Sequence, residues 1–331
     1  MPKPDQNDLR LDLNEGQKRL FPGDYQRYAR ESDLAGLRTR TARRLEVSPK
    51  QLVFTNGAYH ALDIIFNFMV ADNEEVIMPV PTFAFYGKFE RYRRIVFRKI
   101  IFAKDLKLPV RRVLRAINKK TKLIYLVNPN NPLGTAASIV ELEAIIRIAK
   151  SKNILVVIDE VYAEFWGNTT LPLLKKYNNL IVLRSFSKIG LSGLKLGVMV
   201  SSGSLTAKLE EMRGDLYNVN LASIVLVDRF LSRPEQVRRY VEEIKLTKTK
   251  LSEFFLERGI EHLPSQTNFI TVKFKDPALV CSRLKSLGVL IKDLSHFPDA
   301  PRWLKSFVRL TVPRAKDLPI LLKNLERILT L

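Results

Sequence analysis

Cysteine and histidine are scarce in this chain of 331 residues. The one cysteine, Cys281, has no partner for a disulfide within the chain, and its helical-looking surroundings favour a packed thiol over a nucleophile. The three histidines, His60, His262 and His296, show no metal-ligand spacing with one another or with the cysteine. We therefore expect no metal site.

Long apolar runs are also missing. Charged residues interrupt every apolar stretch before it reaches the length needed to cross a membrane. The N-terminal segment MPKPDQNDLRLDLNEG is polar and has no apolar centre of the kind found in signal peptides. With 46% hydrophobic and 27% charged residues, the composition is that of a soluble globular protein with room for two domains. We expect a cytoplasmic protein with no membrane partner.

Acidic residues are few compared with basic ones. The chain has 34 Asp and Glu against 55 Lys and Arg, which gives a net charge of +21. Such an excess is typical of nucleic-acid-binding proteins. However, the cations are spread over RTRTARR, RYRR, RRVLR, RRY and the C-terminal half, without a finger, RNP or basic-zipper pattern. We therefore expect no nucleic acid partner, and solvated helix faces that attract anionic or phosphorylated ligands.

Short apolar runs alternate with helical patterns through the first two thirds of the chain. Strands are predicted at 52–55, 75–78, 98–102, 123–127, 154–158, 180–183 and 196–200. This alternation is typical of an α/β domain with a mostly parallel sheet between helices. Strand-like runs at 268–274, 289–292 and 307–312 indicate a smaller α+β unit. We predict an N-terminal arm over residues 1–28, a large domain over 29–221 and a small domain over 222–331.

Polar segments follow several predicted strands, where ligands collect in parallel sheets. Asn56-Gly57-Ala58 lies between a strand and a helix, so that free N–H groups and the helix dipole favour an anion there. Ser185, Ser187, Lys188 and Lys195 follow another strand, which places hydroxyls, a lysine and a second cation together. This stretch predicts that Lys188 is a reactive amine that lies beside an anion-binding site.

Two further motifs lie at strand ends. Residues 128–134, NPNNPLG, are by themselves no more than a tight turn, and Asp159 alone is equally a helix N-cap or a buried structural acid. A lone Lys188 is ordinarily a surface residue. The order of these motifs and their shared placement favour a functional site.

On these motifs the chain resembles the fold-type I pyridoxal-phosphate enzymes, and among them the class I/II aminotransferases of the histidinol-phosphate aminotransferase-like branch. The resemblance implies an α/β large domain with a mostly parallel seven-stranded sheet, followed by a smaller α+β domain. Nearly the whole chain is covered by the matching segments LDLNE, FTNGAYHALD, PVPTFAFYG, LVNPNNPLG, VVIDEVYAEF, RSFSKIGLSGLKLG, YNVNLAS, PSQTNFI and FVRLTV.

The resemblance implies a role for each residue around the cofactor ring. Lys188 would form a Schiff base with the aldehyde of pyridoxal phosphate and then transfer the proton. Asp159 matches the carboxylate that faces the pyridine nitrogen, and Asn131 and Tyr162 match the residues that bind the ring hydroxyl. Phe83 falls where an aromatic residue, often Tyr, stacks on the ring.

The cofactor phosphate is assigned in the same way. The resemblance points to the backbone of Gly57 and Ala58, the hydroxyls of Ser185 and Ser187, and Lys195, where Arg is more common and would provide a planar fork. The loop is one residue shorter than the commonest form. Tyr28 aligns with a tyrosine that reaches the cofactor phosphate of the neighbouring subunit, which implies a homodimer with a shared active site; a surface tyrosine is the alternative.

Substrate anions require further cations. Arg309 matches the arginine that binds the substrate carboxylate or phosphate, for which its planar fork is suited. Lys292 falls where the histidinol-phosphate enzymes have a second substrate-binding arginine. Asn14 with Glu15 keeps part of the N-terminal substrate segment, and Pro313 replaces a family glycine.

The implied function is transfer of an amino group between an amino donor and a 2-oxo acid in two half-reactions, with histidinol phosphate and 2-oxoglutarate as the first candidates. A decarboxylase of a phosphorylated amino acid, resembling threonine-phosphate decarboxylase, uses almost the same cofactor residues and stays open. A PLP-sensing DNA-binding regulator needs an extra module, for which residues 1–51 before the first strand are too few. A catalytically idle paralogue disagrees with the joint presence of Lys188, Asp159, Asn131 and Arg309.

Overall fold

Two β-sheets of different size organise the chain. The computed structural model describes residues 25, 27–214 and 219–329. The large sheet has the strand order β1-β7-β6-β5-β4-β2-β3. Its strands are β1 Leu52–Thr55, β2 Glu75–Val80, β3 Val96–Ile101, β4 Thr121–Val127, β5 Leu155–Asp159, β6 Leu180–Ser185 and β7 Gly197–Ser201. Strands β3, β2, β4, β5 and β6 run parallel, whereas β7 is antiparallel to both β6 and β1.

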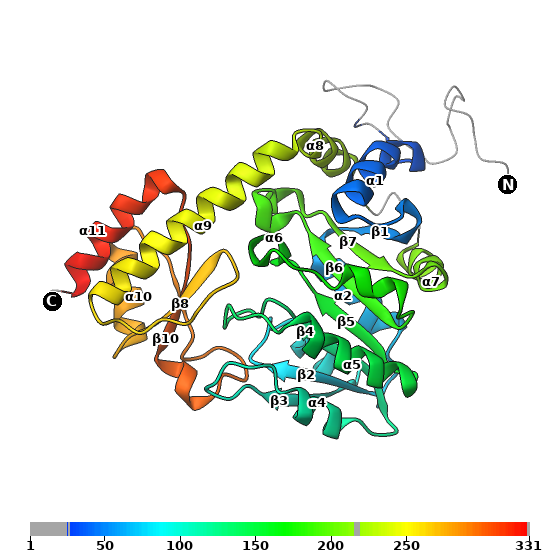
Figure 1. Ribbon diagram of the computed structural model, residues 1–331, viewed down its shortest axis with the longest axis horizontal. Coiled ribbons are helices and arrows are strands. Elements are labelled where there is room, and N and C mark those ends of the chain that lie inside the picture. The colour runs from blue at the N-terminus through cyan, green and yellow to red at the C-terminus, as the bar shows by residue number, and fades with distance from the viewer. Residues whose placement is uncertain (1–24, 26, 215–218, 330–331) are drawn as a thin grey trace.

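Helices surround this sheet (Figure 1). Their bounds are α1 Glu31–Leu45, α2 Gly57–Phe68, α3 Gly87–Tyr92, α4 Val110–Ala116, α5 Ile139–Ser151, α6 Ala163–Trp166, α7 Gly203–Arg213 and α8 Leu221–Leu231. Helix α5 shows why they dock: Leu142, Ile145, Ile146 and Ala149 recur at helical spacing and are buried. Its first turn is closed by a capping box in which Ser138 and Glu141 each accept a backbone N–H of the other.

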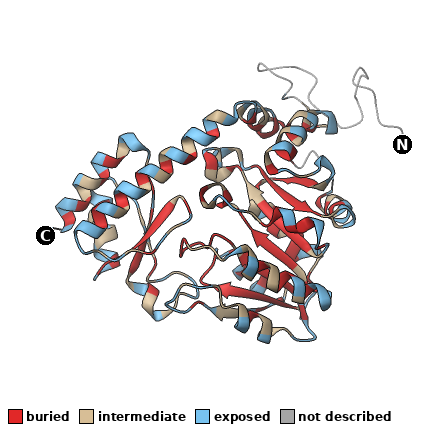
Figure 2. Cartoon of the chain, in the orientation of Figure 1, coloured by how far each residue is buried: buried red, intermediate tan, exposed pale blue. Residues whose placement is uncertain are grey.

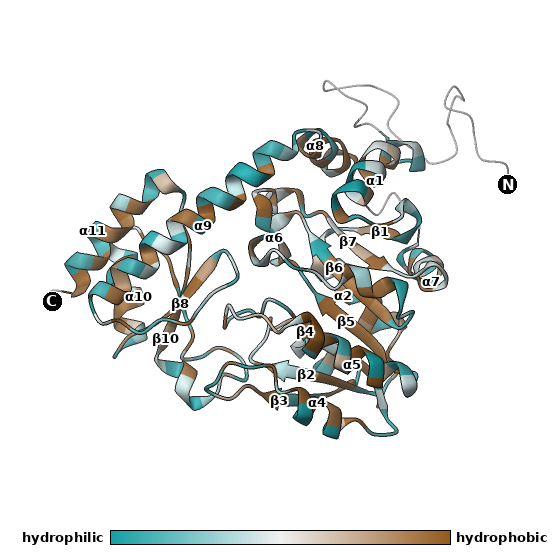
Figure 3. Cartoon of the chain, viewed as in Figure 1, coloured by the Kyte–Doolittle hydropathy of each residue, from teal (hydrophilic) through white to brown (hydrophobic). Residues whose placement is uncertain are grey.

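Both faces of the central strands are buried, as their unbroken apolar sequences require. In β5, Val156 and Ile158 join the apolar core on one face while Val157 joins the core on the other. Figure 2 shows these strands as buried along their length, and Figure 3 shows the same strands as apolar. The central strands therefore form an apolar layer, and the polar residues of the site come after their carboxyl ends.

The small sheet lies at the other end of the molecule. It contains β8 Phe269–Lys273, β9 Lys292–Asp293 and β10 Phe307–Thr311, in the antiparallel order β8-β10-β9. Helices α10 Pro277–Ser286 and α11 Leu318–Leu329 pack beside it, and the 24-residue helix α9 Pro234–Glu257 runs from the large unit to the small one (Figure 1). The predicted α/β class, with a large mostly parallel sheet and a smaller α+β unit, is confirmed.

Some details differ from the sequence prediction. The strand expected at 289–292 is β9, which covers only Lys292–Asp293 because just two of its residues pair with β10.

Helix α8 packs on α1, where Arg40 binds Asp228 through two hydrogen bonds. We therefore propose that the predicted boundary at residue 221 moves to α9. The predicted arm over residues 1–28 lies almost entirely outside the described residues. Among described residues, no helix is long and apolar enough to cross a membrane.

Candidate active site

A cavity opens beyond the carboxyl ends of β4, β5 and β6, where parallel sheets bind ligands. Most residues predicted for the site line it: Gly57, Ala58, Phe83, Asn131, Asp159, Tyr162, Ser185, Ser187, Lys188 and Lys195. The remaining walls are formed by Asn56, Tyr59, Leu62, Val127 and Val161. Segments separated by more than a hundred residues in the sequence thus converge on one space.

Asp159 ends β5 at the floor of the cavity. Its carboxylate accepts hydrogen bonds from the Tyr125 hydroxyl at 2.9 Å and from the Val161 backbone N–H at 3.2 Å. Burial raises the pKa of Asp159 to about 6, although both hydrogen bonds and the nearby charge of Lys188 act in the opposite direction. At neutral pH this carboxylate is therefore still mostly charged, and a cation placed against it would favour the charged form further.

Lys188 follows β6 in a 3-10 turn, Ser187–Ile189, that ends at Gly190 with a φ of 97°. Its Nζ lies 5.5 Å from the centre of the Tyr162 ring. Burial lowers the pKa of Lys188; Asp159 raises it, and the charges of Arg309 and Lys195 lower it further. A lowered pKa favours the neutral amine, which is the nucleophilic form.

The anion end of the cavity combines a helix N-terminus with hydroxyls and a cation. Gly57 opens α2 with a φ of 75°, and the Thr55 hydroxyl donates to its carbonyl at 3.0 Å. A Cβ added to Gly197 would lie 2.8 Å from the carbonyl carbon of Gly57. This turn and the start of β7 therefore pack so closely that only glycine fits. Ser185, whose Oγ accepts the Ser187 N–H at 3.2 Å, and Lys195 complete this end.

The loop after β4 owes its shape to its asparagines. The Asn128 side chain accepts the Ala137 N–H at 2.7 Å, and the Asn130 side chain accepts the Leu133 N–H at 3.0 Å. These bonds close the loop on itself and leave Asn131 facing the cavity. The small unit holds the loop from outside, because Thr271 of β8 donates to the Pro132 carbonyl at 2.6 Å.

Arg309 enters from the small unit. It lies on β10 and donates a hydrogen bond to the Asn131 side-chain oxygen. Its guanidinium lies 5.4 Å from the centre of the Phe269 ring, whose edge in turn meets Tyr162 at 5.5 Å between ring centres. Burial lowers the pKa of Arg309 and the neighbouring Tyr162 raises it. Lys292 is the β9 partner of Arg309 in the register, so the two side chains share one face.

Of the predicted residues that the structure describes, Arg309, Lys292 and Tyr28 do not line the cavity, and Arg309 meets it only through its hydrogen bond to Asn131. Lys292 is exposed and reaches the site only through its place beside Arg309. Tyr28 is 50% exposed and stands apart from the cavity wall. Asn14 lies outside the described residues. Within the described part of the chain there is no cluster of His, Cys, Asp or Glu that could hold a metal ion.

Sequence reasoning missed the support behind the cavity. Tyr125 lies within the apolar run LIYLV, where it resembles any other core residue. Tyr59, at the start of α2, lines the cavity and meets Phe83 edge to face at 6.3 Å. The one sequence signal for Tyr59 was its position directly after the Asn56-Gly57-Ala58 turn, where a ligand was expected.

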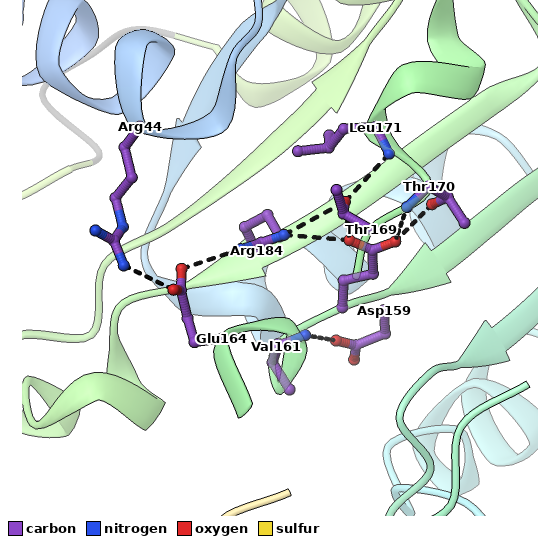
Figure 4. A network of polar contacts seen from close by, with 9 residues as sticks. Arg44, Asp159, Val161, Glu164, Thr169, Thr170, Leu171 and Arg184 are labelled. Atoms are coloured by element: carbon purple, nitrogen blue, oxygen red, sulfur yellow. Dashed lines mark hydrogen bonds and ion pairs between the residues drawn. The ribbon is translucent and has the colours of Figure 1, made fainter. Parts of the chain in front are cut away.

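A buried ion-pair network was also missed. Glu160, directly after Asp159, pairs with Arg184 at 3.2 Å and accepts the Thr170 N–H and hydroxyl at 2.6 Å each. Arg184 continues to Glu164 at 3.0 Å (Figure 4). Arg44 of α1 then binds Glu164 at 2.6 Å. The network ties α1, α6 and β6 together behind the end of β5 that lines the cavity. An acid directly after Asp159 was the one sign of it in the sequence.

The donor set of the cavity fits pyridoxal phosphate. Asp159 offers a buried carboxylate to a ring nitrogen, Asn131 and Tyr162 offer partners to a ring hydroxyl, and Phe83, 40% exposed, offers an open aromatic face. The helix N-terminus, the two serines and Lys195 suit a phosphate. Lys188 supplies an amine for an aldehyde.

Comparison with known proteins agrees with this geometry. Residues 4–325 match the family of class I and II aminotransferases. The histidinol-phosphate aminotransferase of Thermoanaerobacter pseudethanolicus is 32% identical over 295 residues, covering 88% of this chain and 82% of that protein. The enzyme of the same name from Brevibacillus brevis is 32% identical over 297 residues, with 86% and 78% covered.

Solved structures show the same fold. The histidinol-phosphate aminotransferase of Clostridium acetobutylicum superposes with a TM-score of 0.81 at 18% identity, covering 90% of this chain and 89% of that one. The Sinorhizobium meliloti enzyme, in complex with pyridoxal-5'-phosphate, gives 0.78 at 21% identity, with 93% and 84% covered. The chain therefore belongs to the class I and II aminotransferases and is a pyridoxal-phosphate-dependent transaminase.

Proposed function

We propose that this aminotransferase takes an amino donor with an anionic group, with histidinol phosphate as the first donor and 2-oxoglutarate as the acceptor. The observation that carries this proposal is the pairing of Arg309 with Lys292 across β10 and β9. Two cations on one face of the small sheet, one of them bonded to Asn131 at the cavity, suit a substrate phosphate or carboxylate. The names of the relatives support the same donor.

The residue roles are part of the proposal. Bound pyridoxal phosphate supplies an aldehyde for the amino group and a ring that accepts electrons from the substrate carbon. The amine of Lys188 would hold the cofactor through its aldehyde and, once free of it, would move the proton from the substrate carbon. Asp159 keeps its negative charge against the ring nitrogen and so stabilises the protonated ring. Arg309 orients the substrate, so that the carbon to be deprotonated faces Lys188.

We further propose a homodimer in which Tyr28 reaches the cofactor phosphate of the partner subunit. The exposure of Tyr28 away from its own cavity supports a role toward another chain. Lys195 provides only a point charge for the phosphate, which leaves room for a further donor.

Decarboxylation of a phosphorylated amino acid remains the second candidate. The same cofactor residues serve either reaction, since both withdraw electrons from the same substrate carbon. The two differ in which bond of that carbon breaks, and therefore in whether carbon dioxide is released.

The test is a half-reaction screen of the purified holoenzyme with single amino donors. Histidinol phosphate, glutamate, aromatic amino acids and phosphorylated amino alcohols are each mixed with the enzyme, and conversion of the bound cofactor to its amine form is followed by absorbance. We expect the fastest conversion with histidinol phosphate, together with a keto product. Faster conversion with glutamate, an aromatic amino acid or a phosphorylated amino alcohol contradicts histidinol phosphate as the donor, and release of carbon dioxide when a phosphorylated amino acid is added supports the decarboxylase.

Lys292 provides the matched variants for this screen. Lys292→Arg introduces the planar guanidinium that the resemblance implies at this position, and Lys292→Ala removes the charge. We expect KM for the phosphorylated donor to fall or hold in the first and to rise in the second, with the cofactor spectrum unchanged in both. Equal KM values in all three proteins would remove Lys292 from the substrate site.

A further inference from the structure

Positive charge is concentrated at one edge of the large sheet. Residues 88–122 carry 14 Lys and Arg but only two Asp and Glu, so that 35 of the 331 residues hold a charge of +12 out of the total of +21. This segment forms most of α3, the edge strand β3, α4 and the turn into β4. Strand β3 and helix α4 lie side by side along the lower edge of the molecule in Figure 1. The expectation of no nucleic acid partner rested on cations spread over the whole chain, but 14 of the 55 lie in this one segment, which the fold places along a single edge of the sheet.

The cations extend over the whole length of this edge. At the amino end of the strands, the Asn73 N–H donates to the Arg94 carbonyl at 3.1 Å and the Glu75 N–H to the Lys120 carbonyl at 2.8 Å, which places Arg94 and Lys120 near the start of β2. Lys104 and other exposed residues follow β3 at its carboxyl end. Six residues of β3 at about 3.3 Å each span about 20 Å between the two ends.

Helix α4 lies beside β3 and fills the middle of this edge. Arg111, Arg112 and Arg115 are its only fully exposed residues, whereas Val113 faces the core. Arg112 donates to the Ile101 carbonyl of β3 at 2.6 Å, which fixes the helix against the strand. The helix thus presents arginine, and no large apolar side chain, to solvent.

Most of these cations are not neutralised. Arg98 and Lys99 pair with Glu75 at 2.7 Å and Glu90 at 3.0 Å. In contrast, Arg91, Arg94, Lys104, Lys107, the three arginines of α4, Lys119 and Lys120 form no ion pair with a carboxylate in the described ranges 27–214 and 219–329. We call these unpaired cations the basic edge.

We infer that the basic edge binds single-stranded nucleic acid through its phosphate backbone. A row of unpaired cations about 20 Å long matches several successive phosphates of an extended strand. Tyr92 is 75% exposed next to it, and the Arg91 guanidinium lies 6.0 Å from the Tyr92 ring centre. An exposed aromatic ring among cations is the usual platform for base stacking. A membrane surface fits less well, because α4 has no exposed apolar face to insert.

This surface is separate from the transaminase site. Strands β5, β4 and β2 lie between β6, which carries Lys188, and β3. None of the unpaired cations lines the cavity. Changes at the basic edge should therefore leave transamination intact.

The test measures fluorescence anisotropy of labelled oligouridine and oligodeoxythymidine with the holoenzyme between about 50 and 200 mM salt. We expect binding that weakens with salt, with log K falling by about 0.7 per phosphate contact for each unit of log salt. Arg111→Glu/Arg115→Glu should lower the affinity at least about tenfold and flatten this slope. The control Arg238→Glu/Arg239→Glu changes the charge equally at exposed positions of α9 and should keep the affinity within about twofold.

Three results would overturn the inference. The first is no binding of either oligonucleotide at the lowest salt. The second is an equal loss of affinity in both double variants, which would assign binding to net charge alone. The third is binding of the holoenzyme to anionic phosphatidylserine vesicles without binding to oligonucleotides. Transaminase activity, measured in parallel, shows that each variant is folded.

Discussion

The hydroxyl of Tyr125 donates a hydrogen bond of 2.9 Å to the Asp159 carboxylate, and both side chains are buried in the sheet. Burial and the neighbouring Asp159 carboxylate hold the pKa of Tyr125 well above its usual value, so the phenol remains a donor. Tyr125 thus stabilises the charged form of Asp159, the acid that we propose to face the cofactor ring. It is a positioning residue, because it acts through Asp159.

Replacing Tyr125 by Phe should raise the pKa of Asp159 above its value of about 6. A hydrogen bond to a charged group contributes about 1.5–3 kcal/mol, equivalent to about one to two pH units. The active form is the carboxylate, so the acidic limb of the kcat profile and of cofactor affinity should move to higher pH. The measurement is a pH titration of both quantities, with Phe85→Leu, a neighbouring core change, as the control. Unshifted acidic limbs would assign Tyr125 to packing alone.

Lys188→Ala should abolish the covalent bond to the cofactor. We expect no protein-bound cofactor after borohydride reduction and denaturation, and at least about a hundredfold loss of activity, since the proton-transferring group is missing. Lys195→Ala serves as the control, because it should retain the covalent product while binding the cofactor more weakly. Trapped cofactor in Lys188→Ala, detected by mass spectrometry, would contradict the central assignment.

Arg309→Ala should raise KM for the anionic donor while the cofactor spectrum is unchanged. Truncating a buried, hydrogen-bonded charge costs about 2–5 kcal/mol, which corresponds to a loss of about 30-fold or more in kcat/KM. Arg309→Lys keeps the charge but loses the planar guanidinium, so its kcat/KM should lie between those of the unchanged protein and Arg309→Ala. Steady-state kinetics with two donors of different length measure this effect. An unchanged substrate profile would move the anion site elsewhere.

Gly197→Ala should weaken cofactor binding through a backbone clash. The added Cβ would lie 2.8 Å from the Gly57 carbonyl carbon and 2.9 Å from the Ala58 nitrogen, so the phosphate-binding turn must shift. We expect a loss of about 1–3 kcal/mol in unfolding free energy, together with lower affinity for pyridoxal phosphate. Gly193→Ala, whose Cβ would meet no atom within 4 Å, should be nearly neutral. Equal effects in calorimetry and cofactor titration would show that the close approach is unimportant.

Glu160→Ala should destabilise the protein more than a surface ion pair does. The carboxylate is fully buried and Arg184 is only 12% exposed, so the change leaves a mostly buried charge with one partner fewer. Breaking such a pair costs about 3–5 kcal/mol. Glu242→Ala, which breaks the exposed pair with Lys245 on α9, should cost less than about 1 kcal/mol. Urea unfolding of the apoprotein compares the two variants without cofactor effects.

Local patterns determined which parts of this structure could be predicted from the sequence. The strand over Leu52–Thr55 was placed to the residue, because an apolar run followed by turn residues marks it. The cofactor residues could be named because their motifs, most of them at strand ends, resemble those of a known family. Tyr125 and Arg184 could not, since their roles depend on which strands become neighbours. The antiparallel placement of β7 likewise arises from tertiary pairing, which no local pattern encodes.

The close contact between Gly57 and Gly197 also bears on how the protein is made. The two glycines are separated by 140 positions in the sequence, and β1 must dock on β7 before they meet. When only the first half of the chain has been synthesised, the phosphate-binding turn therefore has no partner and the pocket cannot form. Such long-range pairing is slow compared with local helix formation. Binding of pyridoxal phosphate should therefore occur late in folding. Added pyridoxal phosphate should stabilise the folded protein but not the nascent chain.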